Sequence, residues 1–151
     1  MQPMQLFVDT HYASPYALSV FVALCEKKRP FEVATIDLSG GEHHRPEYAK
    51  LSLTHRVPTL VDGEFSLSES SAITEYLHET YPGPALYPAD AKARARARQV
   101  HAWLRSDLTS IRSERSTVVL FYGPSTTPLS IDAQAAVEKL FTVADALLAH
   151  G

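Results

Sequence analysis

Apolar positions in the first part of the chain alternate between short continuous runs and helix-spaced repeats. The run at 6–8 predicts a buried strand, and Ser14 followed by Pro15 predicts a helix start, with the serine as N-cap. Pro30 stops that helix, and residues 31–37 alternate well enough to predict a second strand. Together they predict a βαβ unit with parallel strands. The apolar face predicted for the helix is Leu18, Phe21, Leu24 and Cys25.

The middle of the chain predicts the rest of a small sheet and another helix. A loop and a short irregular helix fill residues 39–51, and Asp62-Gly63 favours a hairpin between strands at 59–61 and 65–67. Residues 70–81 then predict a helix. The hairpin strands must join the first two strands, so the expected fold is a mixed four-stranded sheet with the element order βαβ, α, ββα. The inward-facing residues of the last helix are Ile73, Tyr76 and Leu77.

Prolines and a glycine cluster at residues 82–88 and predict a break between two domains. The expected division is an α/β domain over residues 1–82, a linker over 83–89 and an all-helical domain over 90–151. Asp90 is placed to cap a long helix with an apolar face at Val100, Trp103, Leu104, Leu108 and Ile111. Ser130 is placed to cap a further helix.

Composition narrows the possible function classes. The 151 residues are 45% hydrophobic and 21% charged, with a net charge of -3, which argues against a nucleic-acid-binding surface. Cys25 is the single cysteine, so one chain offers no disulfide, CxxC pair or cysteine-based zinc site. The longest apolar run, residues 20–25, is too short to span a bilayer, and the N-terminus lacks the features of a signal peptide. The expectation is a cytoplasmic protein without membrane or nucleic-acid partners.

Val57-Pro58 lies at the mouth of a predicted strand. A proline there cannot donate to the sheet, and a cis bond would expose the backbone of the preceding residue. A ligand with a peptide backbone can then dock beside Val57 like an extra strand. The alternative is that Pro58 simply begins a strand after a loop.

The sequence Ser68-Glu69-Ser70-Ser71 lies where a predicted strand meets a predicted helix. A helix N-terminus suits a carboxylate, and Glu69 can pair with an ammonium group. Ser70 and Glu69 would therefore hold an amino-acid-like head group between them. The alternative is an ordinary N-cap with an acidic first turn.

Ser14 has the same two interpretations at the start of the first helix. It is either a plain N-cap or a hydroxyl donor that, together with the helix dipole, lowers the pKa of a nearby thiol. Tyr12 and Thr10 are alternative hydroxyls for that role. Cys25 lies on the apolar helix face and is expected to be a buried core residue rather than a nucleophile.

His43-His44 beside Glu42 offers no third ligand, and adjacent histidines rarely bind one ion, so no metal site is predicted. His44 and Arg56 are instead alternative partners for a second carboxylate of the ligand.

These motifs, in this order, resemble the cytosolic glutathione S-transferases, and within them the bacterial YfcF-like subgroup. The resemblance covers nearly the whole chain. It implies an α/β thioredoxin-like N-terminal domain followed by an all-α domain that is incomplete relative to the family, because family members continue past residue 151 with a further buried helix. The stretches that carry it include Ser14-Pro15-Tyr16, Gly41-Glu42-His43, Arg56-Val57-Pro58, residues 67–73 and residues 94–108.

The resemblance implies roles for individual residues. Val57, beside cis-Pro58, would pair its backbone with the cysteinyl part of glutathione, while Glu69 and Ser70 would hold the γ-glutamyl head. Ser14 would face the sulfur as the catalytic residue. The thiol-transfer classes carry cysteine at that position, so thiolate stabilisation is expected here rather than mixed-disulfide chemistry. The Asn-Pro that many relatives carry before Val-Pro is absent, which leaves His44 and Arg56 as candidates for the glycine carboxylate.

The expected function is that of a glutathione S-transferase. It would bind glutathione as a co-substrate without a metal, stabilise its thiolate, and transfer it to a small electrophile or use it to reduce a peroxide. The resemblance also implies a homodimer. The alternative is a non-catalytic glutathione-binding or dimerisation module of the same fold.

Overall fold

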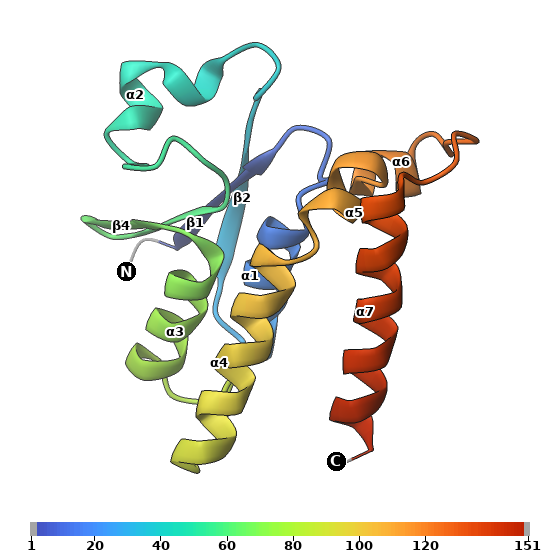
Figure 1. Ribbon diagram of the computed structural model, residues 1–151. Helices are drawn as coiled ribbons and strands as arrows, with labels where there is room; N and C mark the ends of the chain where they lie inside the picture. The colour runs from blue at the N-terminus through green and yellow to red at the C-terminus, as the bar shows by residue number, and fades with distance from the viewer. Residues whose placement is uncertain (1–2, 150–151) are drawn as a thin grey trace. The chain divides into compact units, whose positions relative to one another are not determined.

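A computed structural model describes residues 3–149 of the chain. The chain divides between Asp90 and Ala91 into two compact units, whose elements are labelled in Figure 1. The segment 83–89, expected as a linker, belongs to the first unit. Buried Tyr87 anchors it there, because its hydroxyl lies 3.0 Å from Oγ1 of Thr74.

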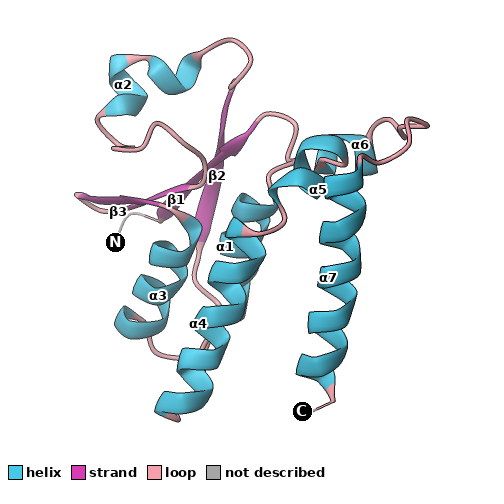
Figure 2. Cartoon of the chain, viewed as in Figure 1, coloured by secondary structure: helices cyan, strands magenta, loops and turns pink. Residues whose placement is uncertain are grey.

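A four-stranded sheet organises the first unit (Figure 2). Its strand order is β2-β1-β3-β4, with β1 parallel to β2 and the pairs β1–β3 and β3–β4 antiparallel. The predicted mixed sheet is therefore confirmed. The strands are β1 (Met4–Asp9), β2 (Phe31–Ile36), β3 (Thr59–Asp62) and β4 (Phe65–Ser68).

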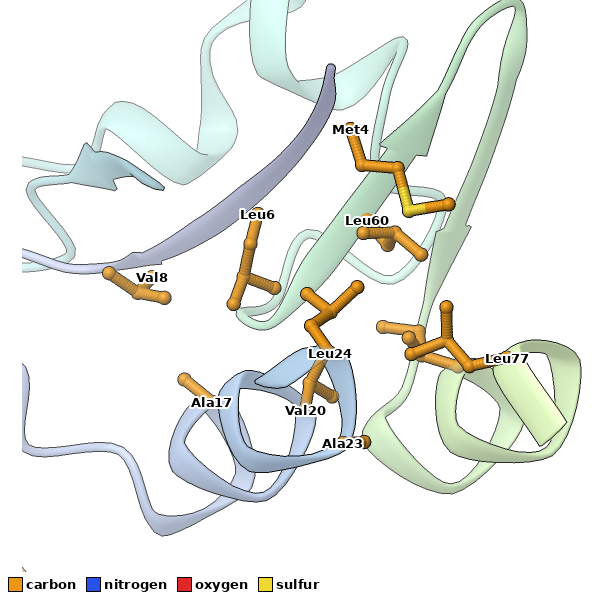
Figure 3. Close-up of a cluster of buried hydrophobic side chains, with 10 residues drawn as sticks. Met4, Leu6, Val8, Ala17, Val20, Ala23, Leu24, Leu60 and Leu77 are labelled. Carbon is orange, nitrogen blue, oxygen red and sulfur yellow. The ribbon is translucent and has the colours of Figure 1, made fainter. Parts of the chain in front are cut away.

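One face of this sheet is covered by two helices, α1 (Pro15–Glu26) and α3 (Ser70–Thr80). Alternate residues of β1 and β3 point toward them, because successive side chains of a strand face opposite sides. Figure 3 shows Leu6 and Leu60 meeting Leu24 and Leu77 in this layer. All four are at most 1% exposed, as are Val20 and Ile73, so this layer is the core of the unit.

The buried face of α1 differs from the predicted one. Ala17, Val20 and Leu24 lie against the sheet, whereas Leu18 and Phe21 are 56% and 42% exposed. Cys25, expected in the core, is also exposed. The helix carries two apolar stripes with the same spacing, and periodicity alone cannot choose between them. The smaller residues of the stripe at 17, 20 and 24 allow the helix to approach the strands closely.

Leu24→Ala is expected to lower the free energy of unfolding by about 3 kcal/mol, because it removes a fully buried side chain and leaves a cavity. Leu18→Ala, on the exposed stripe of the same helix, should cost less than about 1 kcal/mol. Urea unfolding of the two variants measures both losses in the free energy of unfolding. Equal losses would contradict this assignment, because they would show that the exposed stripe packs as tightly as the sheet-facing one.

The opposite face of the sheet receives the segment between β2 and β3. This segment contains a short 3₁₀ turn, η1 (Glu42–His44), and α2 (Pro46–Ala49), in agreement with the predicted irregular helix. The ring of Phe7 on β1 meets that of Tyr48 edge to face, with 5.6 Å between centroids. Tyr48 is 4% exposed and thus fixes α2 to this face.

The second unit is helical, as predicted, and contains α4 (Ala91–Ser106), α5 (Thr109–Glu114), α6 (Thr117–Phe121) and α7 (Ile131–Leu148). Ser130 caps α7 as expected, its Oγ accepting the N–H of Ala133 at 3.2 Å. The single long helix predicted through Ile111 is wrong, because α4 ends at Ser106. The guanidinium of Arg112 donates to the carbonyls of Leu104 and Arg105 at 2.6 and 2.5 Å and so caps the end of α4.

Across residues 3–149, no helix combines the length and apolar character that a bilayer crossing requires.

Candidate functional site

Strand register gathers the predicted site segments at one end of the sheet. Phe7 near the end of β1 pairs with Thr59 at the start of β3, and Thr59 pairs with Ser68 at the end of β4. The loop after β1, the residues before β3 and the residues after β4 therefore emerge side by side. These are the segments 9–14, 57–58 and 69–70, which lie far apart in the sequence.

Ser14 occupies the N-cap of α1, as predicted. Its Oγ accepts the N–H of Ala17 at 3.2 Å, and Pro15 follows in the first turn. Because a hydroxyl both accepts and donates, this bond leaves the Ser14 proton for an acceptor beyond the helix. Ser14 is half-buried. The helix N-terminus beside it adds a positive dipole end, which also favours a negative charge there.

Asp9, which was not predicted as a site residue from the sequence, shapes the loop that carries Ser14. Its Oδ1 accepts the N–H groups of His11 and Ala13 at 3.2 and 2.9 Å, and its Oδ2 accepts that of Ser14 at 2.9 Å. Asp9 is 7% exposed. An aspartate at a strand end before a loop is a recognised signal for such backbone bonds, so its position at the end of β1 pointed to this role.

An apolar groove opens beside Ser14 within the first unit. Its cavity measures about 410 Å³. Leu18 and Phe21, the exposed stripe of α1, supply part of its wall. Of the two alternative hydroxyls, Tyr12 lines the groove and is 67% exposed, whereas Thr10 is not among its described lining residues. The described residues that line the groove are Val8, Tyr12, Ser14, Ala17, Leu18, Phe21 and Val33.

The Val57–Pro58 peptide bond is cis, as the resemblance implied. Pro58 is buried and Val57 is half-buried. Four hydroxyl groups that were not connected from the sequence are hydrogen-bonded to one another near this bond, and they are here called the hydroxyl chain: Tyr48, Ser52, Thr59 and Ser68. Burial raises the pKa of the Tyr48 phenol, so it stays protonated and can donate a hydrogen bond.

Glu69 is the N-cap residue of α3, but its side chain makes no capping hydrogen bond. Its backbone has φ 73° and ψ 112°, a conformation that favours glycine. Such strain in a non-glycine residue costs about 1–3 kcal/mol and is concentrated at ligand-binding sites. The Glu69 side chain is exposed, and Ser70, the first residue of the helix, is 1% exposed. Glu69 therefore does not cap α3 through its side chain, and the first turn of the helix has no acidic residue.

His44 and Arg56 both lie at the surface. The His44 ring lies 5.8 Å from that of His55, the residue before Arg56, and 3.9 Å from that of His43. The two predicted residues are thus on neighbouring segments, next to the cis bond. Within residues 3–149, no group of three or more His, Cys, Asp or Glu side chains is arranged to hold a metal ion.

Comparison with known proteins gives family matches over most of the chain. Residues 10–85 match the family described as "Glutathione S-transferase, N-terminal domain", and residues 90–151 match "Glutathione S-transferase, C-terminal domain". A glutathione transferase homologue from Burkholderia, solved with bound glutathione, is 41% identical with a TM-score of 0.76, covering 97% of this chain and 69% of that one. These matches confirm the predicted fold class, a thioredoxin-like domain followed by a helical one.

Other relatives are named either as glutathione transferases or as an isomerase. A delta-class glutathione transferase from Nilaparvata lugens is 31% identical with a TM-score of 0.78, covering 97% of this chain and 67% of that one. A probable maleylacetoacetate isomerase from Vibrio cholerae is 35% identical over 114 residues, which are 74% of this chain and 53% of the relative. Glutathione S-transferase theta-2 of Homo sapiens is 37% identical over 66% of this chain and 41% of its own. The chain therefore spans about half the length of the curated relatives it matches.

Proposed function

The chain belongs to the glutathione S-transferase family, and from that premise we propose that it binds glutathione at the end of its sheet and activates the thiol. The observation that carries the proposal is the register Phe7–Thr59–Ser68, which brings the three site segments together. Each segment offers a group that matches a different part of the tripeptide.

The γ-glutamyl head has an ammonium and a carboxylate at one carbon. The exposed Glu69 carboxylate is available for the ammonium, because it takes no part in capping α3. The N-terminus of α3 at Ser70 suits the carboxylate. The strained backbone of Glu69 supports this assignment, since strain that serves no packing purpose marks functional positions.

The cysteinyl part would lie along Val57. With a cis bond following it, the Val57 backbone amide and carbonyl can pair with an extended peptide as a neighbouring strand would. His44 and Arg56, on adjacent surface segments, are the candidates for the glycine carboxylate.

The sulfur would then face Ser14. A hydrogen bond from the Ser14 hydroxyl and the dipole of α1 both stabilise the thiolate relative to the thiol, and so lower its pKa. The groove beside Ser14 would hold the second substrate, an electrophile or a hydroperoxide with an apolar body. Holding both reactants in place adds proximity to thiol activation.

Isothermal titration of the chain with glutathione tests the binding step. Saturable binding of one glutathione per chain is expected, with S-methylglutathione, in which the thiol is blocked, binding as well. Glutathione lacking its γ-glutamyl ammonium, as the N-acetyl derivative, should bind more weakly because Glu69 loses its partner. An absence of saturable binding would contradict the proposal.

A non-catalytic glutathione-binding module is the second candidate. It is favoured by one observation: every residue proposed to contact glutathione lies in the first unit, before Ala91. Turnover assays with an aromatic halide and with an organic hydroperoxide separate the two candidates. Binding without thiol-dependent turnover of either compound would establish the module.

Two finer assignments complete the proposal. The stretches at 14–16, 56–58 and 94–108 support membership of the bacterial YfcF-like subgroup. A homodimer is proposed from the family resemblance, and its mass is measurable by light scattering in solution.

A further inference from the structure

The hydroxyl chain lies between the sheet and α2, on the face opposite the apolar core. Ser52 and Thr59 are fully buried at 0% exposed, and Tyr48 is 4% exposed. Buried hydroxyls are costly unless each finds a partner. These four do so among themselves and with the backbone of a single residue, Arg56.

One arrangement of protons satisfies every member of the chain. The Arg56 N–H donates to Ser52 Oγ at 3.2 Å, and Ser52 donates to Ser68 Oγ at 2.8 Å. Ser68 then donates to Thr59 Oγ1 at 3.2 Å, and Thr59 donates to the Tyr48 hydroxyl at 3.0 Å. Tyr48 closes the loop by donating to the Arg56 carbonyl at 2.6 Å. The chain thus begins and ends on the backbone of one residue.

Two residues of this network, Arg56 and Ser68, lie next to the proposed glutathione-binding residues. Arg56 immediately precedes Val57, whose backbone is proposed to pair with the cysteinyl part of glutathione. Ser68 immediately precedes Glu69, which is proposed to hold the γ-glutamyl head. Hydrogen bonds in a buried series polarise and strengthen one another, so the spacing between these points is rigidly set.

We propose that the hydroxyl chain is a positioning device that holds Val57 and Glu69 at the separation of two adjacent residues of one peptide ligand. The proposal rests on the glutathione site proposed above. Tyr48, Ser52, Thr59 and Ser68 do not touch the ligand in this arrangement. They act by holding Val57 and Glu69 in the geometry in which one ligand can contact both. Once the first contact has formed, the second then costs no further conformational entropy of the protein.

A purely stabilising role predicts a different result from a positioning role. If the chain only stabilises the fold, removing a hydroxyl weakens the binding of every ligand in proportion to the unfolded fraction. If it sets the separation, ligands that use both points lose more affinity than ligands that use one. Glutathione uses both points, and the dipeptide cysteinylglycine, which lacks the γ-glutamyl head, uses only the Val57 side.

The test compares Thr59→Val, which keeps the shape but removes the hydroxyl, with Thr59→Ser, which keeps the hydroxyl. Dissociation constants are measured for glutathione by calorimetry and for cysteinylglycine by NMR titration, on protein shown by circular dichroism to be folded. In the protein without a substitution, glutathione should bind about 100-fold more tightly than cysteinylglycine. In Thr59→Val this ratio should fall about tenfold, with the dipeptide nearly unaffected, and Thr59→Ser should restore most of it.

Tyr48→Phe provides a second variant if Thr59→Val does not fold, because it keeps the ring that packs on Phe7 and removes only the hydroxyl, with its bonds to Thr59 and to the Arg56 carbonyl. A lowered melting temperature with an unchanged affinity ratio in either folded variant would overturn the positioning role and leave the glutathione site intact. If the protein without a substitution does not bind glutathione, the proposed site itself is overturned, and the positioning role with it.

Discussion

Glu69→Gln is expected to weaken glutathione binding about 30-fold, because hydrogen bonds to charged groups contribute about 1.5–3 kcal/mol and the neutral amide cannot replace the carboxylate opposite an ammonium. The substitution keeps the size of the side chain. It also keeps the backbone preference, so the strain at φ 73° is the same in both proteins. The change in affinity therefore reports the lost charge. Calorimetry at pH 7 gives the two dissociation constants.

Glu64→Gln is the matched control. Glu64 is an exposed carboxylate on the same hairpin, but it lies at the turn between β3 and β4, the far end from Ser68 and Glu69. It changes the net charge by the same amount and should leave the dissociation constant within about twofold, since distant exposed charges are screened by salt. Equal weakening by both variants would mean that glutathione responds to overall charge, and would remove Glu69 from the site.

Local sequence signals predicted most of the first unit. Ser14-Pro15 and Asp62-Gly63 each act through the conformations available to one or two residues, and the structure places both as expected. The cis bond at Pro58 was left open by the local residues and was implied by the family resemblance. The proposed head-group site at Glu69 was also identified locally, from a strand that meets a helix.

Features that depend on distant partners were not predicted. The members of the hydroxyl chain lie 3 to 16 positions from their partners, and serine and threonine at such spacings carry no periodic signal. The exposed stripe of α1 was assigned to the core because two apolar stripes share one helix. The break after Ser106 depends on Arg112 reaching back to cap α4, which requires the folded geometry.

Ser14→Ala is expected to raise the pKa of the bound glutathione thiol by about one to two units, because it removes a charge-assisted hydrogen bond of about 1.5–3 kcal/mol and one unit equals 1.36 kcal/mol. The sign follows from which form is stabilised: the hydroxyl donates to the thiolate, so losing it favours the thiol. An ordinary thiol has a pKa near 8.5, and a value two units lower makes the thiolate the majority form at pH 7. The thiolate absorbance of the bound ligand, titrated from pH 5 to 10, measures both values.

The turnover rate should follow the population of bound glutathione thiolate. At pH 7 the variant should lose roughly 3- to 25-fold in turnover of an aromatic halide, the factor by which its thiolate population falls when the pKa rises from about 6.5 by one to two units. Above pH 9, where the thiol ionises without help, the two proteins should converge. A loss that persists at high pH would assign Ser14 to positioning the substrate rather than to ionising the thiol.

Ser130→Ala is the control that separates the effect of Ser14 on the thiol pKa from its effect as a helix cap. Ser130 caps α7 as Ser14 caps α1, and each accepts an N–H three residues ahead at 3.2 Å. Both variants should lose about 1 kcal/mol of stability as a capping bond is removed. Because Ser130 is not among the residues proposed to contact glutathione, its loss should leave the bound thiol pKa unchanged. An unchanged thiolate titration in Ser14→Ala, with the same loss of stability, would reduce Ser14 to an N-cap and make Tyr12, the other hydroxyl that lines the groove, the next residue to substitute.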